Sequence, residues 1–219
     1  MINENIIELK KEAVEYAKHI ESMIISSTRG VFERDNSLLE KTLKIDEIKS
    51  DQMEISLYEN CINAIAKFQP MAKNLRIIIG LIKMSGNLER IGDHCVNIAE
   101  SGLILNTALP VKSYIDLPKM NTLAIDMLRE AIFAFVNQDK TLAESILNLD
   151  DEIDGYKGKI IRELEDYMTD QKTAYLIVEL MNIVSNLERI ADLTVNICEE
   201  VIYIESGKLM KEVDRSLSV

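Results

Sequence analysis

Two stretches of the sequence repeat a helical phrase that carries a pair of acids. Residues 87–100 read NLERIGDHCVNIAE and residues 186–199 read NLERIADLTVNICE, with ten of fourteen letters identical. Each copy places a Glu four residues before an Asp, giving the pairs Glu89/Asp93 and Glu188/Asp192. Residues four apart on a helix are separated by about 40° in azimuth and about 6 Å along the axis. Each pair therefore presents two neighbouring carboxylates on one helix face.

Such a pair needs an explanation, because like charges at this spacing destabilise a helix by roughly 0.2–0.5 kcal/mol. One explanation is neutralisation by nearby bases, of which Arg90 and Arg189 are adjacent in sequence. The other is a metal ion, because carboxylates are hard oxygen ligands that suit calcium, magnesium, manganese or iron and can bridge several ions.

A second acidic pair precedes each repeated phrase and favours the metal. Both occur on the preceding helical stretch, with the same spacing of four residues. Facing pairs in one bundle would bring four carboxylates to one site. The predicted metal ligands are Glu47, Asp51, Glu89 and Asp93 in the first half, and Asp150, Asp154, Glu188 and Asp192 in the second.

Histidine contributes little to this prediction. The chain holds only His19 and His94, whereas ferritin-like di-iron sites use a Glu-x-x-His motif on two helices. His94 follows Asp93 directly and points about 100° away from it on a helix. We therefore expect His94 to be a surface or interface residue.

Six long helical stretches would position these acids. The first phrase belongs to an apolar stripe of Leu81, Met84, Leu88, Ile91, Cys95 and Ile98, whose spacings alternate between three and four. The second belongs to a matching stripe of Ile183, Leu187, Ile190, Thr194, Ile197 and Val201. The expected helices cover residues 3–27, 35–68, 71–107, 119–137, 140–168 and 172–207, with breaks at Thr28-Arg29-Gly30 and Gln69-Pro70.

No stretch has the period-two alternation of a half-buried strand. Two of the three prolines lie at 110 and 118, and both interrupt a helix. The predicted fold is therefore all-α, with two tandem, similar three-helix bundles. The first covers residues 1–109, a linker covers 110–117, and the second covers 118–219.

Composition excludes several classes of function. A net charge of −12 argues against nucleic-acid binding. The start of the chain lacks a signal-peptide pattern and no run of 18 apolar residues occurs, so we expect a cytoplasmic protein without membrane insertion. Cys61, Cys95 and Cys198 are odd in number and lie within helical patterns, which indicates buried thiols in a reducing compartment.

The sequence resembles the PhoU family from about Ile6 to Gly207. The most specific stretches are AKFQPMAKNLR at 66–76, LERIGD at 88–93 and its echo LERIAD at 187–192. Two departures occur: the second half lacks the Gln-Pro phrase, and Gly92 is replaced by Ala191. The paired acids are present in spite of both departures.

This resemblance implies an accessory protein of phosphate uptake and homeostasis that restrains the phosphate-starvation response. The implied partners are the ATPase of a phosphate ABC transporter and a membrane sensor histidine kinase. It also implies metal ions on the paired acids, with iron first and manganese, magnesium, calcium or zinc as alternatives. The family is not known as enzymes, so no catalytic residues are expected.

Two other functions remain open from the sequence. A carboxylate-bridged metalloenzyme would share the acidic helices, although it usually needs histidine ligands. A purely structural helical adaptor would use the acids as solvated charge. Exposed helical faces also favour a homodimer.

Overall fold

The computed structural model describes residues 2–109, 115–168 and 170–208, and these residues are almost entirely helical. The first half contains α1 (Ile2–Phe32), α2 (Asn36–Lys41), a π-helical turn η1 (Thr42–Asp46), α3 (Glu47–Phe68) and α4 (Ala72–Leu105). The second half contains α5 (Leu117–Asn137), α6 (Lys140–Leu147), α7 (Asp150–Glu165) and α8 (Gln171–Ser206).

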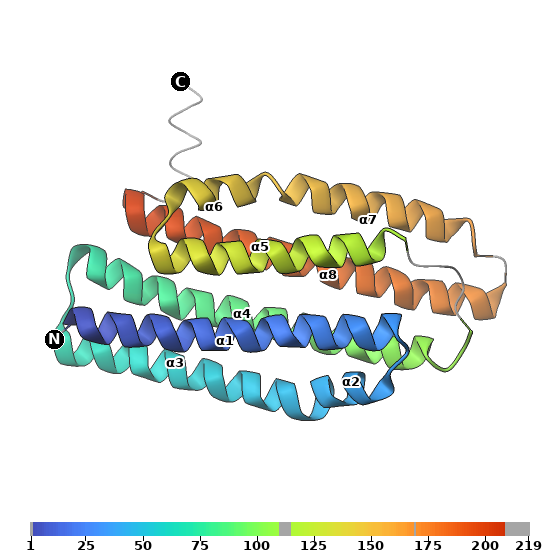
Figure 1. Cartoon of the computed structure of the whole chain (residues 1–219), viewed down its shortest axis with the longest axis horizontal. Helices are drawn as coiled ribbons and strands as arrows, with labels where there is room; N and C mark the ends of the chain where they lie inside the picture. The colour runs from blue at the N-terminus through green and yellow to red at the C-terminus, as the bar shows by residue number, and fades with distance from the viewer. Residues whose placement is uncertain (1, 110–114, 169, 209–219) are drawn as a thin grey trace, which may run out of the picture.

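The helices run side by side along the long axis of the molecule (Figure 1). In the first half α1, α3 and α4 pack together, and in the second half α5 and α8 pack with the α6–α7 segment. The most extensive packing between the halves joins α4 to α8, and the buried residues form one continuous apolar core. The predicted all-α fold of paired bundles is confirmed.

Both apolar stripes predicted from the repeated phrase are buried. Every member of the α4 stripe, from Leu81 to Ile98, is at most 1% exposed, as is every member of the α8 stripe from Ile183 to Val201. The acids of the phrase lie on the flank of the same helices. Core packing on the stripes therefore fixes the direction in which the acids point.

The first helix does not break at Thr28-Arg29-Gly30, and this prediction was wrong. Gly30 is an ordinary helical residue, and α1 continues to Phe32. A Cβ at Gly30 would overlap Leu39 of α2, and a Cβ at Gly102 of α4 would lie 3.0 Å from the same side chain. Glycine is used here for close packing of Leu39 rather than for a left-handed cap.

Two of the six predicted helices are interrupted, at equivalent places in the two halves. The expected helix 35–68 contains the π-helical turn Thr42–Asp46, and the expected helix 140–168 breaks at Asn148 and Leu149. In each half the irregular turn comes directly before the acidic pair, which begins at the first residue of the following helix, Glu47 or Asp150.

The remaining boundaries follow the predicted signals. Gln69 ends α3 in a left-handed conformation, and Gly207 ends α8 with φ of 70°. Residues 110–114 of the predicted linker lie outside the described residues, and α5 begins at Leu117 with Pro118 in its first turn. Within the described ranges, no helix is both long enough and apolar enough to span a bilayer.

Candidate metal centre

Acids from α3 and α4 face one another in the first half. Burial, followed by the charges of Asp93, Glu54 and Asp51, raises the pKa of Glu89 above its ordinary value. Burial and the charges of Asp51 and Asp93 likewise raise the pKa of Glu54. Charge effects of this kind indicate that the four carboxylates lie in the same region of the α3–α4 surface. We call Asp51, Glu54, Glu89 and Asp93 the first-half acid cluster.

Glu54 was absent from the predicted ligands, and it takes the place expected for Glu47. Glu54 lies three residues after Asp51 on α3, which keeps it on the same face of the helix. Glu47 lies one turn before Asp51, and its charge is not among those that shift the pKa of Glu54 or Glu89. The acid-x-x-acid spacing of Asp51 and Glu54 was the available sequence signal.

A buried hydrogen bond lies beneath the first-half acid cluster. Tyr16 of α1 and Ser50 of α3 share a hydrogen bond of 3.1 Å between their hydroxyl oxygens. Burial raises the pKa of the Tyr16 phenol, and the charges of Glu54, Glu89 and Asp51 add to that shift. The Tyr16 side chain is fully buried. The first-half acid cluster therefore lies near a buried phenol.

Gly92 permits α3 to approach α4 at this level. A Cβ at Gly92 would lie 3.1 Å from Ser50 Oγ and 3.3 Å from Ile20 Cδ1, tighter than ordinary van der Waals contact. The corresponding residue of the second phrase is Ala191, which is buried. The Gly-to-Ala difference therefore reflects packing around the Tyr16–Ser50 pair.

The second half repeats the arrangement with α7 and α8. Burial and the charges of Asp192, Asp154 and Glu188 raise the pKa of Asp150. Burial and the charges of Glu188 and Asp154 also raise the pKa of Asp192, while Arg189 and Lys157 act in the opposite direction. All four predicted second-half residues are thus neighbours, and we call them the second-half acid cluster.

The second-half acid cluster contains its own cation. Lys157 Nζ lies 2.9 Å from Glu188 Oε1, and the two side chains are only 31% and 16% exposed. Lys157 follows Asp154 by three residues, as Glu54 follows Asp51. One half therefore has a carboxylate where the other has an ammonium group.

The donor chemistry of both clusters suits a hard cation, because it consists of carboxylate oxygens. In the described part of the chain, however, no three Asp, Glu, His or Cys side chains are arranged closely enough to hold a metal ion as they stand. The clusters are therefore open sets of neighbouring acids rather than closed coordination shells.

Both histidines are engaged away from the clusters. His94 of α4 hydrogen-bonds through Nδ1 to Asn186 Oδ1 of α8 at 2.8 Å, which makes it an interface residue as predicted. His19 is buried and donates from Nε2 to the Asp46 carbonyl oxygen of the π-helical turn at 2.8 Å. The three cysteines are buried and free, as expected.

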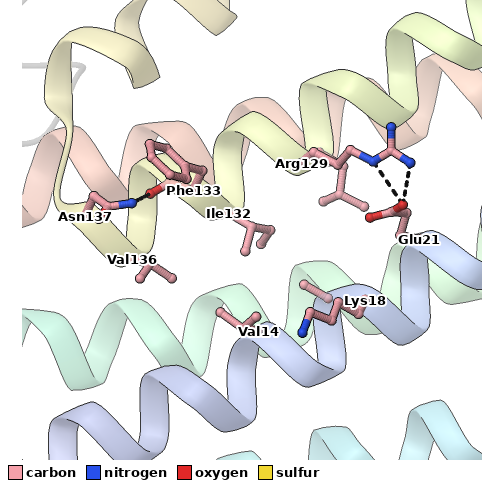
Figure 2. Close-up of a pocket in the computed structure, with 10 residues that line it drawn as sticks. Val14, Lys18, Glu21, Arg129, Ile132, Phe133, Val136 and Asn137 are labelled. Carbon is pink, nitrogen blue, oxygen red and sulfur yellow. Dashed lines mark hydrogen bonds and ion pairs between the residues drawn. The ribbon is translucent and has the colours of Figure 1, made fainter.

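A hollow of about 380 Å³ lies between α1 and α5, outside both clusters. Figure 2 shows Val14, Ile132, Phe133 and Val136 around it, with the Arg129–Glu21 ion pair of 2.6 Å beside it. Its lining is mainly aliphatic and aromatic. It offers apolar contact and no convergent set of metal ligands.

The comparisons with known proteins agree on one protein family. The PhoU domain model matches residues 13–102 and 117–201, once in each half. A PhoU homolog of Aquifex aeolicus is 31% identical over 205 residues, covering 93% of this chain and 92% of that protein. PhoU homolog 1 of Thermotoga maritima is 36% identical over 185 residues, covering 84% of this chain and 79% of that protein.

Solved structures agree with the sequence relatives. The crystal structure of PhoU from Pseudomonas aeruginosa matches with a TM-score of 0.89 and 27% identity, over 95% of this chain and 100% of that one. The phosphate transport system regulatory protein PhoU from Streptococcus pneumoniae matches with a TM-score of 0.88 and 25% identity, over 96% and 99%. Because the domain model and the relatives each cover most of its length, the chain belongs to the PhoU family.

Proposed function

We propose that this protein is a regulatory accessory protein of phosphate uptake, acting in the cytoplasm as a negative regulator of the phosphate-starvation response. The relatives it matches are named as accessory proteins of phosphate-specific transport systems. Its partners would be the ATPase of the phosphate ABC transporter and a membrane sensor histidine kinase. Family membership, joined to a surface built of long helices, supports this role.

We further propose that the acid clusters bind metal ions. The observation that supports this proposal is that acids on two different helices raise one another's pKa values in both halves of the molecule. In each cluster burial and neighbouring negative charge raise carboxyl pKa values, namely those of Glu54, Glu89, Asp150 and Asp192. A bound cation would relieve this repulsion, and its binding would draw the carboxylates inward.

Iron is the first candidate, with manganese, magnesium, calcium or zinc as alternatives. In the first half Asp51, Glu54, Glu89 and Asp93 would hold the ion, with Glu47 one turn away. In the second half Asp150, Asp154, Glu188 and Asp192 would do so, in competition with Lys157. The bound metal would supply positive charge to an acidic surface and so change how that surface meets a partner or an anion.

The metal proposal is tested by elemental analysis of protein purified without chelators, before and after loading with ferrous iron or Mn²⁺. We expect at least one tightly held ion per chain, and loss of that ion in Glu89→Gln/Asp93→Asn. A matched control is Asp126→Asn/Glu130→Gln, an exposed acid-x-x-x-acid pair on α5. Equal metal content in both variants would contradict the proposal.

The regulatory proposal is tested separately, by purifying the full chain with the transporter ATPase and with the cytoplasmic part of the sensor kinase. Direct binding to either protein is the expected result. Deleting the gene for this protein from its host should also raise the expression of phosphate-starvation genes when phosphate is abundant. Unchanged expression would reject the negative regulatory role without bearing on metal binding.

A metalloenzyme is less well supported than a regulator. Both histidines of the chain are held in hydrogen bonds elsewhere, His94 by Asn186 and His19 by the Asp46 carbonyl. Neither contributes an imidazole to an acid cluster. Sustained oxygen consumption by the ferrous protein would favour the enzyme and argue against the regulatory reading.

A further inference from the structure

Two adjoining hollows form one groove along the seam between α1 and α5. The first, of about 380 Å³, is the hollow of Figure 2, and the second, of about 350 Å³, continues from it toward the start of α1. Val14 of α1 and Val136 of α5 line both hollows. The groove follows α1 from Ile7 to Glu21, which is about 21 Å at the helical rise of about 1.5 Å per residue. We call it the α1–α5 groove.

Polar contacts join α1 to α5 at two levels of this seam. Arg129 of α5 donates to Glu21 Oε1 at 2.6 Å, and Lys10 of α1 donates to the Val136 carbonyl oxygen at 2.8 Å. Between these levels α1 presents Val14, whose short side chain does not fill the space toward α5. Because α1 packs far more extensively against α4 than against α5, the seam can remain open without loosening α1.

The α1–α5 groove exposes apolar side chains to solvent. Phe133 is 59% exposed and Ile7 is 53% exposed, whereas Leu128 and Ile132, which also line the groove, are buried. A long apolar groove of this kind accepts the apolar face of another helix, with anchors at positions i, i+3 or i+4 and i+7. Phe133 is the largest exposed side chain of the lining, so it is the expected centre of such a contact.

Bases outnumber acids around the groove, although the chain as a whole is acidic. The lining of the two hollows contains four basic residues and two acidic ones, whereas the chain has a net charge of −12. The charged residues are Lys10, Lys11, Lys18, Arg129, Glu15 and Glu21. Complementary charge selects a partner and fixes its orientation. A helix that enters this groove should therefore carry acids beside its apolar face.

Two of these lysines can turn to a partner at little cost. Lys11 pairs with Glu8 and Lys18 pairs with Glu15, and all four side chains are more than half exposed. Exposed ion pairs between neighbouring turns of one helix contribute little to stability, because water screens them and both side chains lose rotamer freedom. A carboxylate that is held over the groove by an apolar anchor can therefore replace either glutamate.

We infer that the α1–α5 groove binds an amphipathic helix of a protein partner, with apolar side chains against Phe133 and Val14 and with acids facing Lys11 and Lys18. The inference goes beyond the proposed function, because it requires neither a metal ion nor phosphate regulation. Both acid clusters lie on other helices, on α3 with α4 and on α7 with α8. Loss of either proposed role would therefore leave the groove and its test unchanged.

The first experiment uses helix-stabilised peptides of about fourteen residues, the length that spans the groove. One peptide has leucines at i, i+3, i+7 and i+10 with glutamates on both flanks, and the second has lysines in place of the glutamates. Fluorescence anisotropy measures the binding of each peptide to the full chain. We expect the acidic peptide to bind roughly tenfold or more tightly than the basic one. Equal affinities, or no binding of the acidic peptide, would overturn the inference.

Variants of the chain then locate the binding surface. Phe133→Ser should weaken binding of the acidic peptide by roughly tenfold or more, and Lys11→Glu/Lys18→Glu should reverse the preference between the two peptides. Tyr175→Ser is the matched control, because Tyr175 is an aromatic residue of α8 that is 55% exposed and lies outside the groove lining. Circular dichroism confirms that the variants remain folded. An effect of Tyr175→Ser as large as that of Phe133→Ser would overturn the assigned surface.

Two other occupants of the groove would be detected with the same variants. Sedimentation of the chain alone measures self-association, and flotation with phosphatidylglycerol vesicles measures attachment to an anionic lipid surface. Either property, if it is lost in Phe133→Ser and kept in Tyr175→Ser while the acidic peptide fails to bind, assigns the groove to that occupant. That result would overturn the inference of a partner helix.

Discussion

Lys157 Nζ is held 2.9 Å from Glu188 Oε1 at the place where the first half has Glu54 facing Glu89. The two acid clusters are thus alike in their four carboxylates but differ in charge. A lysine ammonium already balances part of the second cluster. A metal ion entering there would have to displace that contact, whereas in the first half the equivalent residue, Glu54, is itself one of the four carboxylates.

The first prediction concerns unequal metal affinity. Glu54→Lys should convert the first cluster to the second type and lower Mn²⁺ affinity there by tenfold or more, because a like charge now competes with the ion. Lys157→Glu should do the reverse in the second half. Isothermal titration calorimetry with Mn²⁺ measures both. Equal affinities for the native chain and for both variants would show that these positions do not control binding.

The second prediction concerns charge removal without metal. Glu89→Gln/Asp93→Asn should raise the free energy of unfolding in the presence of a chelator, by roughly 0.5 kcal/mol for relief of the helical pair. After metal loading the same variant should be less stable than the native chain, because a ligand that binds the folded state stabilises it. Thermal unfolding in chelator and in excess Mn²⁺ gives both values. The same ranking under the two conditions would argue against a metal site.

The pH dependence of the metal-free protein follows from the same acids. The pKa values of Glu54, Glu89, Asp150 and Asp192 are raised in the folded chain, so their ionised forms oppose folding. Lowering the pH from 7 toward these raised values should therefore increase their contribution to stability. Subtracting the pH profile of Glu89→Gln/Asp93→Asn from that of the native chain isolates the first-half part of this effect, and a difference of opposite slope would contradict it.

Asp116 should show the opposite behaviour. Its side chain is 4% exposed and accepts contacts from Lys119 Nζ at 2.9 Å and Lys159 Nζ at 2.6 Å. These partners, Lys159 first, lower the pKa of Asp116. Its stabilising contribution is present above the pKa of the unfolded chain, about 3.9, and is lost as the pH falls through the lowered folded value. Asp116→Asn should therefore reduce the melting temperature at pH 7 and reduce it less in strong acid, with Asp126→Asn as the exposed control.

Two glycines of α4 give a matched prediction about packing between the halves. A Cβ at Gly80 would lie 2.7 Å from Ile204 Cδ1 of α8, whereas a Cβ at Gly86 would meet nothing within 4 Å. Gly80→Val should cost about 1–3 kcal/mol through overpacking. Gly86→Ala should stabilise by up to about 1 kcal/mol through helix propensity. Chemical denaturation measures both, and a destabilised Gly86→Ala would show that residue 86 has a further role.

Much of the fold was predictable because the helical period is strong in this chain. The buried stripes on α4 and α8 follow directly from alternating spacings of three and four. The role of Gly30 within α1 was not predictable, because the side chain that packs against it, Leu39, belongs to another helix. The π-helical turn was missed for a similar reason: the Asp46 carbonyl is held by His19, 27 residues earlier in the chain.

The candidate site was predicted less completely than the fold. The residues of each pair, Glu89/Asp93, Asp150/Asp154 and Glu188/Asp192, share one helix face, and their role as metal ligands stays a prediction. Spacing within a helix does not determine the level at which a neighbouring helix crosses. For that reason Glu54, rather than Glu47, is the second α3 acid beside Glu89, and Lys157 enters the second cluster.

The buried Tyr16 phenol, which shares a hydrogen bond with Ser50, allows the first half to be followed by tyrosine fluorescence. The chain has no tryptophan, so tyrosine dominates its ultraviolet emission. Tyr16 is shielded from solvent and lies beneath the carboxylates, where a paramagnetic ion would shorten its excited-state lifetime. Among the described tyrosines Tyr16 alone is buried, so the component of the fluorescence decay that it contributes would then follow occupancy of the first half, without any added label and independently of events around Lys157.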